Sequence, residues 1–243
     1  MSDKLKIGLL GAGHLGKIHL KCILATECWT LAGFYDPDEK NAATAIAQYG
    51  VPRFDTVEAL LAEVDAVDIV TPTPEHFVLA AQAMRAGKHV FVEKPVTQTV
   101  EEGRSLLQLA EQQAVQVQVG HVERFNPAYL ALKNMLLTPM FIESHRLAAF
   151  QPRGTEVSVI LDLMIHDLDL VLVQGAHEAL ATGQRPLCVG VEVRPELGEG
   201  LEVAELGELD LDAARDLLHR ADLRVADHEP LTLAAAHGPV AGL

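Results

Sequence analysis

Apolar and polar residues form two alternating kinds of block along the first 120 residues. Short, mostly apolar runs that are typical of buried strands occur at 6–10, 66–70 and 89–92. Between them lie longer segments, the first at 14–27, in which apolar residues recur every three or four positions, as on one face of a helix. Strands that alternate with helices form parallel sheets covered on both faces, so the pattern predicts a doubly wound α/β domain over residues 1–120.

The pattern changes after residue 120. Residues 121–172 predict one helix, one strand around MFIESHRLAAF (140–150) and a second helix at 157–172. We expect this segment to be the start of a second, α+β domain.

The composition changes again near residue 172. None of residues 173–243 is Phe, Tyr, Met, Ile, Asn or Lys, although all six types occur before them. These types have AT-rich codons, so the segment has the composition of a GC-rich gene read out of frame. We expect an atypical tail at 173–243 that arises from a frameshift near codon 172. A gene fusion and a divergent natural tail are the alternatives.

Charge and composition disfavour several classes of partner. The net charge of −15 argues against nucleic acids and anionic membrane surfaces. No apolar run is long enough to span a bilayer, and the N-terminal residues lack the pattern of a signal peptide. The three cysteines (Cys22, Cys28 and Cys188) are too few for a disulfide framework, and no further ligands accompany them. These features predict a cytoplasmic protein with no metal site.

A glycine-rich turn, GAGHLG, follows the first predicted strand and opens the first predicted helix. It supplies Gly11, Gly13 and Gly16, and Asp36 stands at the end of the second strand, twenty residues after Gly16. This spacing is the fingerprint of a dinucleotide-binding Rossmann domain. The helix that begins at His14 and Leu15 would offer its free N–H groups to a pyrophosphate. Asp36 would bind the adenosine ribose and repel a 2′-phosphate, so the predicted cofactor is NAD rather than NADP.

Polar residues follow two later strands, and ligands of such sheets bind beyond the carboxyl ends of the strands. Thr71 and Pro72 begin the loop after the third strand and are expected to line the cofactor. His76 would either join them or lie in solvent in the first turn of the next helix, and the second interpretation is favoured. Glu93 and Lys94 end the fourth strand, where a lysine is well placed to meet a substrate.

Ionisable residues interrupt the apolar run of the last predicted helix in DLMIHDLDL, at 162–170. Buried charges are costly unless they are paired, so such residues usually have a partner or a task. Asp162 and His166 are four residues apart and would share one helical face. Histidine titrates near neutral pH and can act as a general base that Asp162 orients. Asp169 could contact His166 or face water, and salt-bridged acids on an ordinary helix are the alternative.

These motifs together resemble the glucose–fructose oxidoreductase / inositol dehydrogenase (Gfo/Idh/MocA) family over roughly residues 4–172. The resemblance implies a second domain with a broad, mostly antiparallel sheet, so the α+β domain that begins at residue 121 is expected to be incomplete in this chain. The resemblance implies NAD(P)-dependent oxidation of a secondary alcohol, a CH–OH group, on a sugar, cyclitol or related small molecule. It also implies that Lys94, Asp162 and His166 are the catalytic residues. Whether the lysine or the histidine is the base stays open. The expected cofactor-binding residues are Gly11, Gly13, His14, Leu15, Gly16, Asp36, Thr71, Pro72, His76 and Glu93.

A finer resemblance, in GHVERFNPA (120–128) and ESHRLAAFQPR (143–153), is to bacterial UDP-N-acetylglucosamine 3-dehydrogenases within the family. It implies oxidation of the sugar 3-hydroxyl, on a route to the amino sugar of some lipid A. Besides Lys94, the expected substrate-binding residues are Arg124, Asn126 and Arg153, because guanidinium groups suit a pyrophosphate. Each arginine could instead pair with a nearby acid.

Two alternatives to an active sugar-nucleotide dehydrogenase follow from the tail. The chain could be a catalytically impaired remnant that keeps only dinucleotide binding. It could also act on another cyclitol, sugar or biliverdin-like substrate, since substrate choice in the resembled family lies largely in the sheet that the tail replaces. For the same reason the homo-oligomer of the family is doubtful here.

Overall fold

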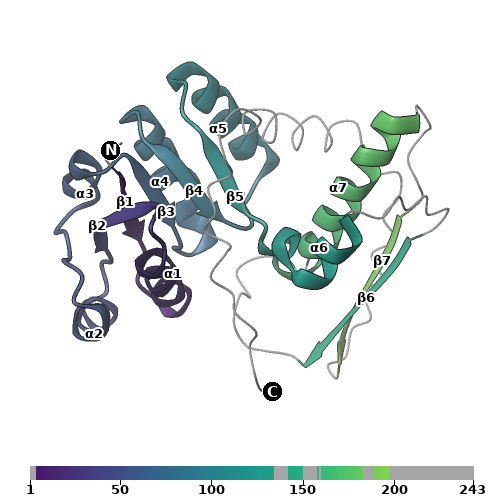
Figure 1. Ribbon diagram of the computed structural model, residues 1–243, viewed down its shortest axis with the longest axis horizontal. Coiled ribbons are helices and arrows are strands. Elements are labelled where there is room, and N and C mark those ends of the chain that lie inside the picture. The colour runs from purple at the N-terminus through teal and green to yellow at the C-terminus, as the bar shows by residue number, and fades with distance from the viewer. Residues whose placement is uncertain (1–3, 134–141, 150–157, 159, 183–188, 197–243) are drawn as a thin grey trace. The chain divides into compact units, whose positions relative to one another are not determined.

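The computed structural model describes residues 4–133, 142–149, 158, 160–182 and 189–196 (Figure 1). These residues fall into two compact units, one of which ends at Gly120 while the other begins at His121.

The first unit contains a five-stranded sheet in which every neighbouring pair of strands is parallel. The spatial order is β2-β1-β3-β4-β5. Strand β1 therefore pairs with β2 on one side and with β3 on the other, and the chain reverses direction across the sheet at this point. The strands are β1 (Leu5–Leu10), β2 (Trp29–Tyr35), β3 (Ala66–Ile69), β4 (His89–Glu93) and β5 (Val117–Gly120).

Local sequence signals set the limits of the helices between these strands. Asp38 caps α2 by accepting a hydrogen bond from the backbone N–H of Asn41, and Thr99 with Glu102 forms a capping box at the start of α5. The helices are α1 (His14–Ala25), α2 (Glu39–Tyr49), α3 (Val57–Glu63), α4 (Thr73–Arg85) and α5 (Val100–Gln113).

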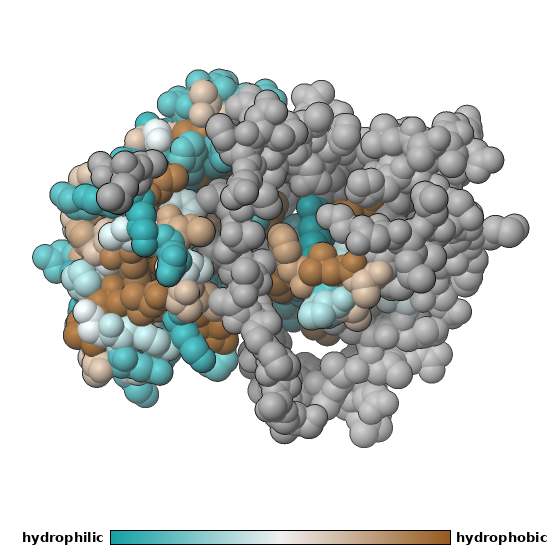
Figure 2. Space-filling view, in the orientation of Figure 1, coloured by the Kyte–Doolittle hydropathy of each residue, from teal (hydrophilic) through white to brown (hydrophobic). Residues whose placement is uncertain are grey.

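Helices flank the sheet on both faces (Figure 1), and an apolar core lies on each face. One core joins the strands to α1 and α2 and includes Leu20 and Phe34. The other joins them to α3, α4 and α5 and includes Leu60 and Met84. Apolar residues that remain exposed lie among hydrophilic ones on the face drawn in Figure 2. The predicted doubly wound α/β fold of residues 1–120 is therefore confirmed.

The described residues of the second unit form three helical segments, a π turn and a pair of strands. A 3₁₀ turn η1 (Val122–Phe125) leads into α6 (Pro127–Lys133), and a π turn η2 (Ile160–Met164) leads into α7 (Ile165–Thr182). Strands β6 (Ile142–Ala149) and β7 (Val189–Glu196) pair in parallel over their full length.

The structure differs from the sequence prediction beyond Leu172. The last predicted helix does not end there but continues to Thr182, since 173–182 remain rich in Ala, Leu and Val. Strand β7 lies in the segment that we interpreted as an atypical tail. The remainder of that segment, 197–243, lies outside the described residues. Among the residues described, no helix has the length and apolar character that crossing a membrane requires.

The packing of α1 gives a direct test of the core. Leu20 is fully buried and Leu24, one turn later on the same helix, is 50% exposed. Replacement of Leu20 by Ala should lower the free energy of unfolding by about 2–5 kcal/mol, because it leaves a cavity between helix and sheet. Leu24→Ala, the matched control, should change it by less than about 0.5 kcal/mol. Urea unfolding measures both, and similar losses would contradict the burial of Leu20 and the exposure of Leu24.

Candidate active site

The turn between β1 and α1 is tight because a backbone hydrogen bond closes it and its glycines have no side chains that would clash. The N–H of Gly11 donates to the carbonyl oxygen of Tyr35 at 2.9 Å. Gly11 has a φ of +95°, which residues with a side chain rarely adopt. A Cβ on Gly16 would lie 1.9 Å from the carbonyl oxygen of Gly11. Helix α1 can therefore begin this close to β1 only with glycine at position 16.

The beginning of α1 is suited to bind an anion. Gly13 is the N-cap residue and provides no side-chain cap, and His14 and Leu15 are exposed in the first turn. A Cβ on Gly13 would meet no atom within 4 Å, so the space beside it is open. The first N–H groups of a helix lack intrahelical partners and carry the positive end of its dipole. A pyrophosphate could approach the backbone here without a clash.

The Asp36 carboxylate is hydrogen-bonded to the backbone of the glycine turn. Its Oδ2 accepts a hydrogen bond from the N–H of Ala12 at 2.7 Å, and its Oδ1 accepts one from the N–H of Asp38 at 2.8 Å. Each carboxylate oxygen has a second lone pair for a ribose hydroxyl. Arg53 donates to the carbonyl oxygen of Asp36, and its charge is offset by Glu39 at 2.8 Å. The Asp36 carboxylate thus lies against the glycine turn.

The loop after β3 brings a polar atom to the same edge of the sheet. The hydroxyl oxygen Oγ1 of Thr71 is buried and makes no hydrogen bond within the described structure. Such atoms normally have a partner, and a bound ligand would supply one. Pro72 is exposed beside it as the N-cap of α4. The open space at Gly13, the uncapped helix and Thr71 together fit a dinucleotide.

His76 does not lie in solvent, so the favoured interpretation of this residue was wrong. It is only 1% exposed because it lies between two loops. Its Nδ1 is 2.8 Å from the carbonyl oxygen of Pro95, and its Nε2 is 2.8 Å from that of Thr71. Both ring nitrogens are therefore occupied by backbone groups. His76 can serve a cofactor by fixing these loops rather than by contact through its ring nitrogens.

Strand β4 delivers Lys94 to the same edge, where the carboxyl ends of the parallel strands meet. Lys94 is half-buried, and its N–H donates to Oε2 of Glu93 at 3.2 Å. The Glu93 carboxylate packs against Gly120 at the end of β5, where a Cβ would lie 2.6 Å from Oε1. The side chain of Glu93, expected to contact the cofactor, thus has structural neighbours on two strands.

A buried charged cluster behind Lys94 was missed by the sequence interpretation. Nδ1 of His19 on α1 is 2.8 Å from Oδ2 of Asp68, and its Nε2 is 3.3 Å from Oε1 of Glu93. Asp68 stands in the middle of β3 and is fully buried. The signal that could have revealed this cluster is an acid inside the apolar run AVDIV, since a carboxylate there requires a partner.

Opposing effects set the protonation of this cluster. Burial lowers the pKa of His19, but the charge and hydrogen bond of Asp68, with those of Glu93, outweigh burial and raise it to about 10. Burial raises the pKa of Asp68, against the opposing effect of His19. Both shifts mean that the folded cluster holds its protons more tightly than the unfolded chain. We describe His19 as an imidazolium between two acids.

The second unit holds the other two candidate catalytic residues. Asp162 lies in the π turn η2, where its N–H donates to the carbonyl oxygen of Ser158 at 3.0 Å, and His166 lies in the first turn of α7. Both side chains are half-buried. The sequence predicted an ordinary helix here. A single π turn changes the angular spacing of the side chains and is frequent at functional sites.

Arg124 forms the ion pair that was the alternative to a substrate contact. Its Nε and Nη2 donate to the two carboxylate oxygens of Asp169 at 2.8 and 2.7 Å. Asp169 is buried, so the expectation that it faces water was wrong. Asn126 is exposed and bonds locally to Glu123. Arg153 lies outside the described residues.

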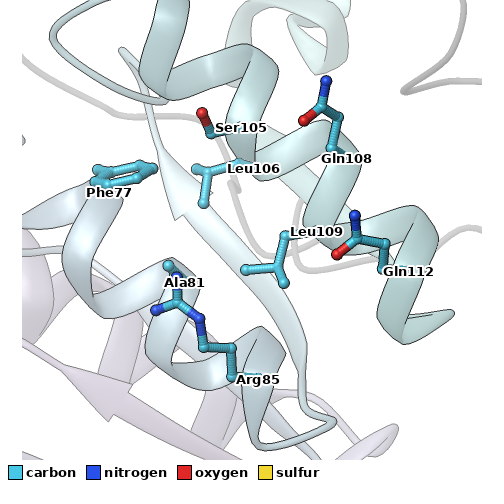
Figure 3. Close-up of a pocket in the computed structure, with 8 residues that line it drawn as sticks. All are labelled: Phe77, Ala81, Arg85, Ser105, Leu106, Gln108, Leu109 and Gln112. Atoms are coloured by element: carbon cyan, nitrogen blue, oxygen red, sulfur yellow. The ribbon is translucent and has the colours of Figure 1, made fainter.

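A groove between α4 and α5 contains none of these residues. Figure 3 shows Leu106 and Leu109 of α5 opposite Phe77 and Ala81 of α4. Polar side chains lie along the rim; they are Arg85, Ser105, Gln108 and Gln112. The groove lies on the helical layer and offers no cluster of ionisable side chains for chemistry.

Comparison with known proteins identifies the first unit. Residues 5–121 match the model of an oxidoreductase family, Gfo/Idh/MocA, described as having an NAD-binding Rossmann fold. The match agrees with the glycine turn and sheet and confirms the predicted cofactor class.

Two of the curated relatives are dehydrogenases by name. The chain is 42% identical over 186 residues to the UDP-N-acetylglucosamine 3-dehydrogenase of Acidithiobacillus ferrooxidans. The aligned region covers 76% of this chain and 56% of that protein. It is 31% identical over 176 residues to the inositol 2-dehydrogenase of Rhizobium meliloti, and this aligned region covers 68% of this chain and 53% of that protein. The chain therefore spans little more than half the length of these relatives.

Solved structures give the same grouping. The Acidithiobacillus ferrooxidans enzyme superposes with a TM-score of 0.66 over 70% of this chain and 56% of its own, at 42% identity. The apo scyllo-inositol dehydrogenase of Lactobacillus casei superposes with a TM-score of 0.65 over 72% of this chain and 56% of its own, at 29% identity.

Two glycines of the turn should separate stability from cofactor binding. Gly13→Ala places a methyl group in open space, so we expect the free energy of unfolding to change by less than about 0.5 kcal/mol while NADH affinity falls about tenfold or more. Gly16→Ala drives a Cβ into a backbone carbonyl and should cost about 2–4 kcal/mol of stability. Urea unfolding and NADH fluorescence measure the pair. Unchanged NADH affinity in Gly13→Ala would show that a pyrophosphate does not bind at this turn.

The buried cluster predicts how stability depends on pH. The pKa of His19 is raised to about 10, so its stabilising contribution is complete below about 6.5 and is lost as the pH rises to 10. Relative to the double variant His19→Gln, Asp68→Asn, the native chain should lose on the order of 1 kcal/mol per pH unit between pH 7 and 10. Urea unfolding at several pH values measures the difference. A constant difference over this range would mean that His19 is not charged in the folded protein.

Proposed function

Since this chain belongs, through residues 5–121, to the Gfo/Idh/MocA oxidoreductase family, we propose that it is an NAD-dependent dehydrogenase of a secondary sugar hydroxyl. The observation that carries the proposal is the placement of Lys94 at the sheet edge that also holds the glycine turn, Asp36 and Thr71. A lysine at this edge would meet a substrate that lies beside the cofactor.

The proposed chemistry divides between the cofactor and three side chains. NAD, when bound, supplies the acceptor for the hydride that leaves the hydroxyl-bearing carbon. The Lys94 ammonium would hold the substrate oxygen and stabilise the negative charge that develops on it. His166 would take the hydroxyl proton as general base, with Asp162 orienting the ring and stabilising its protonated form.

The proposed substrate is UDP-N-acetylglucosamine, oxidised at its 3-hydroxyl. Support comes from the relative with that name, which is 42% identical to this chain, and from the motif around Arg124 and Asn126. Arg124 is already paired with Asp169, so this pair is electrically neutral and would contribute hydrogen bonds rather than net charge to a pyrophosphate site. The proposed lipid A context rests on the same relationship.

A second candidate function is dinucleotide binding without turnover. It is favoured by one observation, namely that the chain spans only 56% of the length of the relative with UDP-N-acetylglucosamine 3-dehydrogenase activity in its name. In this case the first unit would bind NAD while the substrate wall is incomplete. Inositol stays the alternative substrate, because inositol 2-dehydrogenases are also among the relatives.

A fluorescence titration with NADH, with and without UDP-N-acetylglucosamine, tests the proposal. We expect NADH to bind and the sugar nucleotide, but not inositol, to change its affinity at least about threefold. Lys94→Ala is the matched variant, and it should retain NADH binding but lose the response to the sugar nucleotide. NADH binding with no response would favour the second candidate. Absence of NADH binding by a chain that circular dichroism shows to be folded would refute both.

A further inference from the structure

The backbone on each side of Lys94 is connected to a histidine, through Glu93 to the largely buried His19 on one side and directly to the buried His76 on the other. On one side, the N–H of Lys94 donates to Oε2 of Glu93 at 3.2 Å, and Oε1 of Glu93 is 3.3 Å from Nε2 of His19. On the other side, the carbonyl oxygen of Pro95 is 2.8 Å from Nδ1 of His76. The position of Lys94 thus depends on side chains that need not touch a substrate.

His19 is anchored firmly enough to fix Glu93. Its Nδ1 is 2.8 Å from Oδ2 of Asp68, whose backbone lies in the centre of the sheet between β1 and β4. His19 is largely buried, as are both acids. Gly120 closes the far side of the Glu93 carboxylate, where even a Cβ would lie 2.6 Å from Oε1. Glu93 therefore has little freedom to swing away from the N–H of Lys94.

The two nitrogens of His19 serve different neighbours. The Nδ1 contact offsets the buried charge of Asp68, which a purely structural role requires. The Nε2 contact reaches Glu93, and through it the backbone of Lys94. A residue that only compensates Asp68 would not need this second contact. The second contact is longer than the first, but it connects helix α1 to the end of β4.

We propose that His19 is a positioning residue for Lys94, acting through Glu93. The ion-pair contact of Nε2 orients the Glu93 carboxylate, and the carboxylate in turn holds the N–H of Lys94 at the sheet edge. The role of Lys94 in catalysis rests on the proposed function, whereas the connection itself rests on the contacts of His19, Glu93 and Lys94 alone.

Two replacements separate the arms of the imidazole. His19→Asn keeps an N–H donor near the position of Nδ1, and His19→Gln keeps one near the position of Nε2. Both remove the positive charge. The Gln variant should therefore be the less stable of the two, since it leaves Asp68 without its partner, but it should retain the contact with Glu93. Lys21→Gln, an exposed change on the same helix, is the control.

The test is the hydrogen-exchange rate of the Lys94 amide, measured without cofactor or substrate by mass spectrometry with single-residue fragmentation. We expect exchange about tenfold faster in His19→Asn than in the native chain, and within about threefold of native in His19→Gln despite its lower melting temperature. Lys21→Gln should leave both quantities unchanged. Equal acceleration in the Asn and Gln variants, or none in either, would refute the role of the Nε2 contact.

Glu93→Gln tests the same connection if a His19 variant does not fold. It keeps the shape of the side chain but replaces one acceptor oxygen with a donor, so one of its two contacts is lost. In either orientation of the amide, the connection from Nε2 of His19 through this side chain to the N–H of Lys94 is broken, so we expect faster exchange at Lys94. Exchange at the native rate in this variant would refute the proposal. A failure of NADH to bind would refute the proposed function and leave these exchange results standing.

Discussion

The close contact between Gly16 and Gly11 is the constraint on which the rest of the site depends. Helix α1 starts against the end of β1 only because position 16 has no side chain. This contact exposes the first N–H groups of α1 beside the open space at Gly13, and it brings the N–H of Ala12 to Asp36. It also sets the position of α1 on the sheet, which brings His19 into contact with Asp68 of β3 and Glu93 of β4. A shift of the helix would therefore disturb the phosphate, ribose and lysine positions together.

Buried ionisable residues support the carboxyl end of the sheet from inside the first unit. Asp68 would be costly in the middle of a sheet without the opposite charge of His19. Glu93 shares that charge, and His76 bridges the loops that follow β3 and β4. The carboxyl end of the sheet thus combines open space for a ligand with loops that buried side chains hold in place. Preorganisation of this kind lowers the entropy that a ligand must lose when it binds.

The parts of the site that depend on local spacing were predictable from the sequence. Gly11, Gly16 and Asp36 follow a fixed geometric rule for a strand–turn–helix unit, and Lys94 lies where a strand must end before a proline. The cluster of His19, Asp68 and Glu93 was not predicted, because its members are 25 to 74 residues apart in sequence and meet only through the parallel register. The burial of His76 and the pairing of Arg124 with Asp169 also depend on tertiary contacts. The π turn at Asp162 and the continuation of α7 to Thr182 show that an apolar pattern does not fix helical geometry or ends.

The most direct test of the central claim is to map where the cofactor binds. Backbone amide NMR signals of the chain would be followed while NADH, and separately NADPH, is added. The account predicts the largest changes at Ala12, His14 and Leu15, with saturation at lower concentrations of NADH than of NADPH because Asp36 repels a 2′-phosphate. Changes centred on the groove between α4 and α5, at Arg85 and Gln112, would contradict the assignment of the glycine turn as the cofactor site.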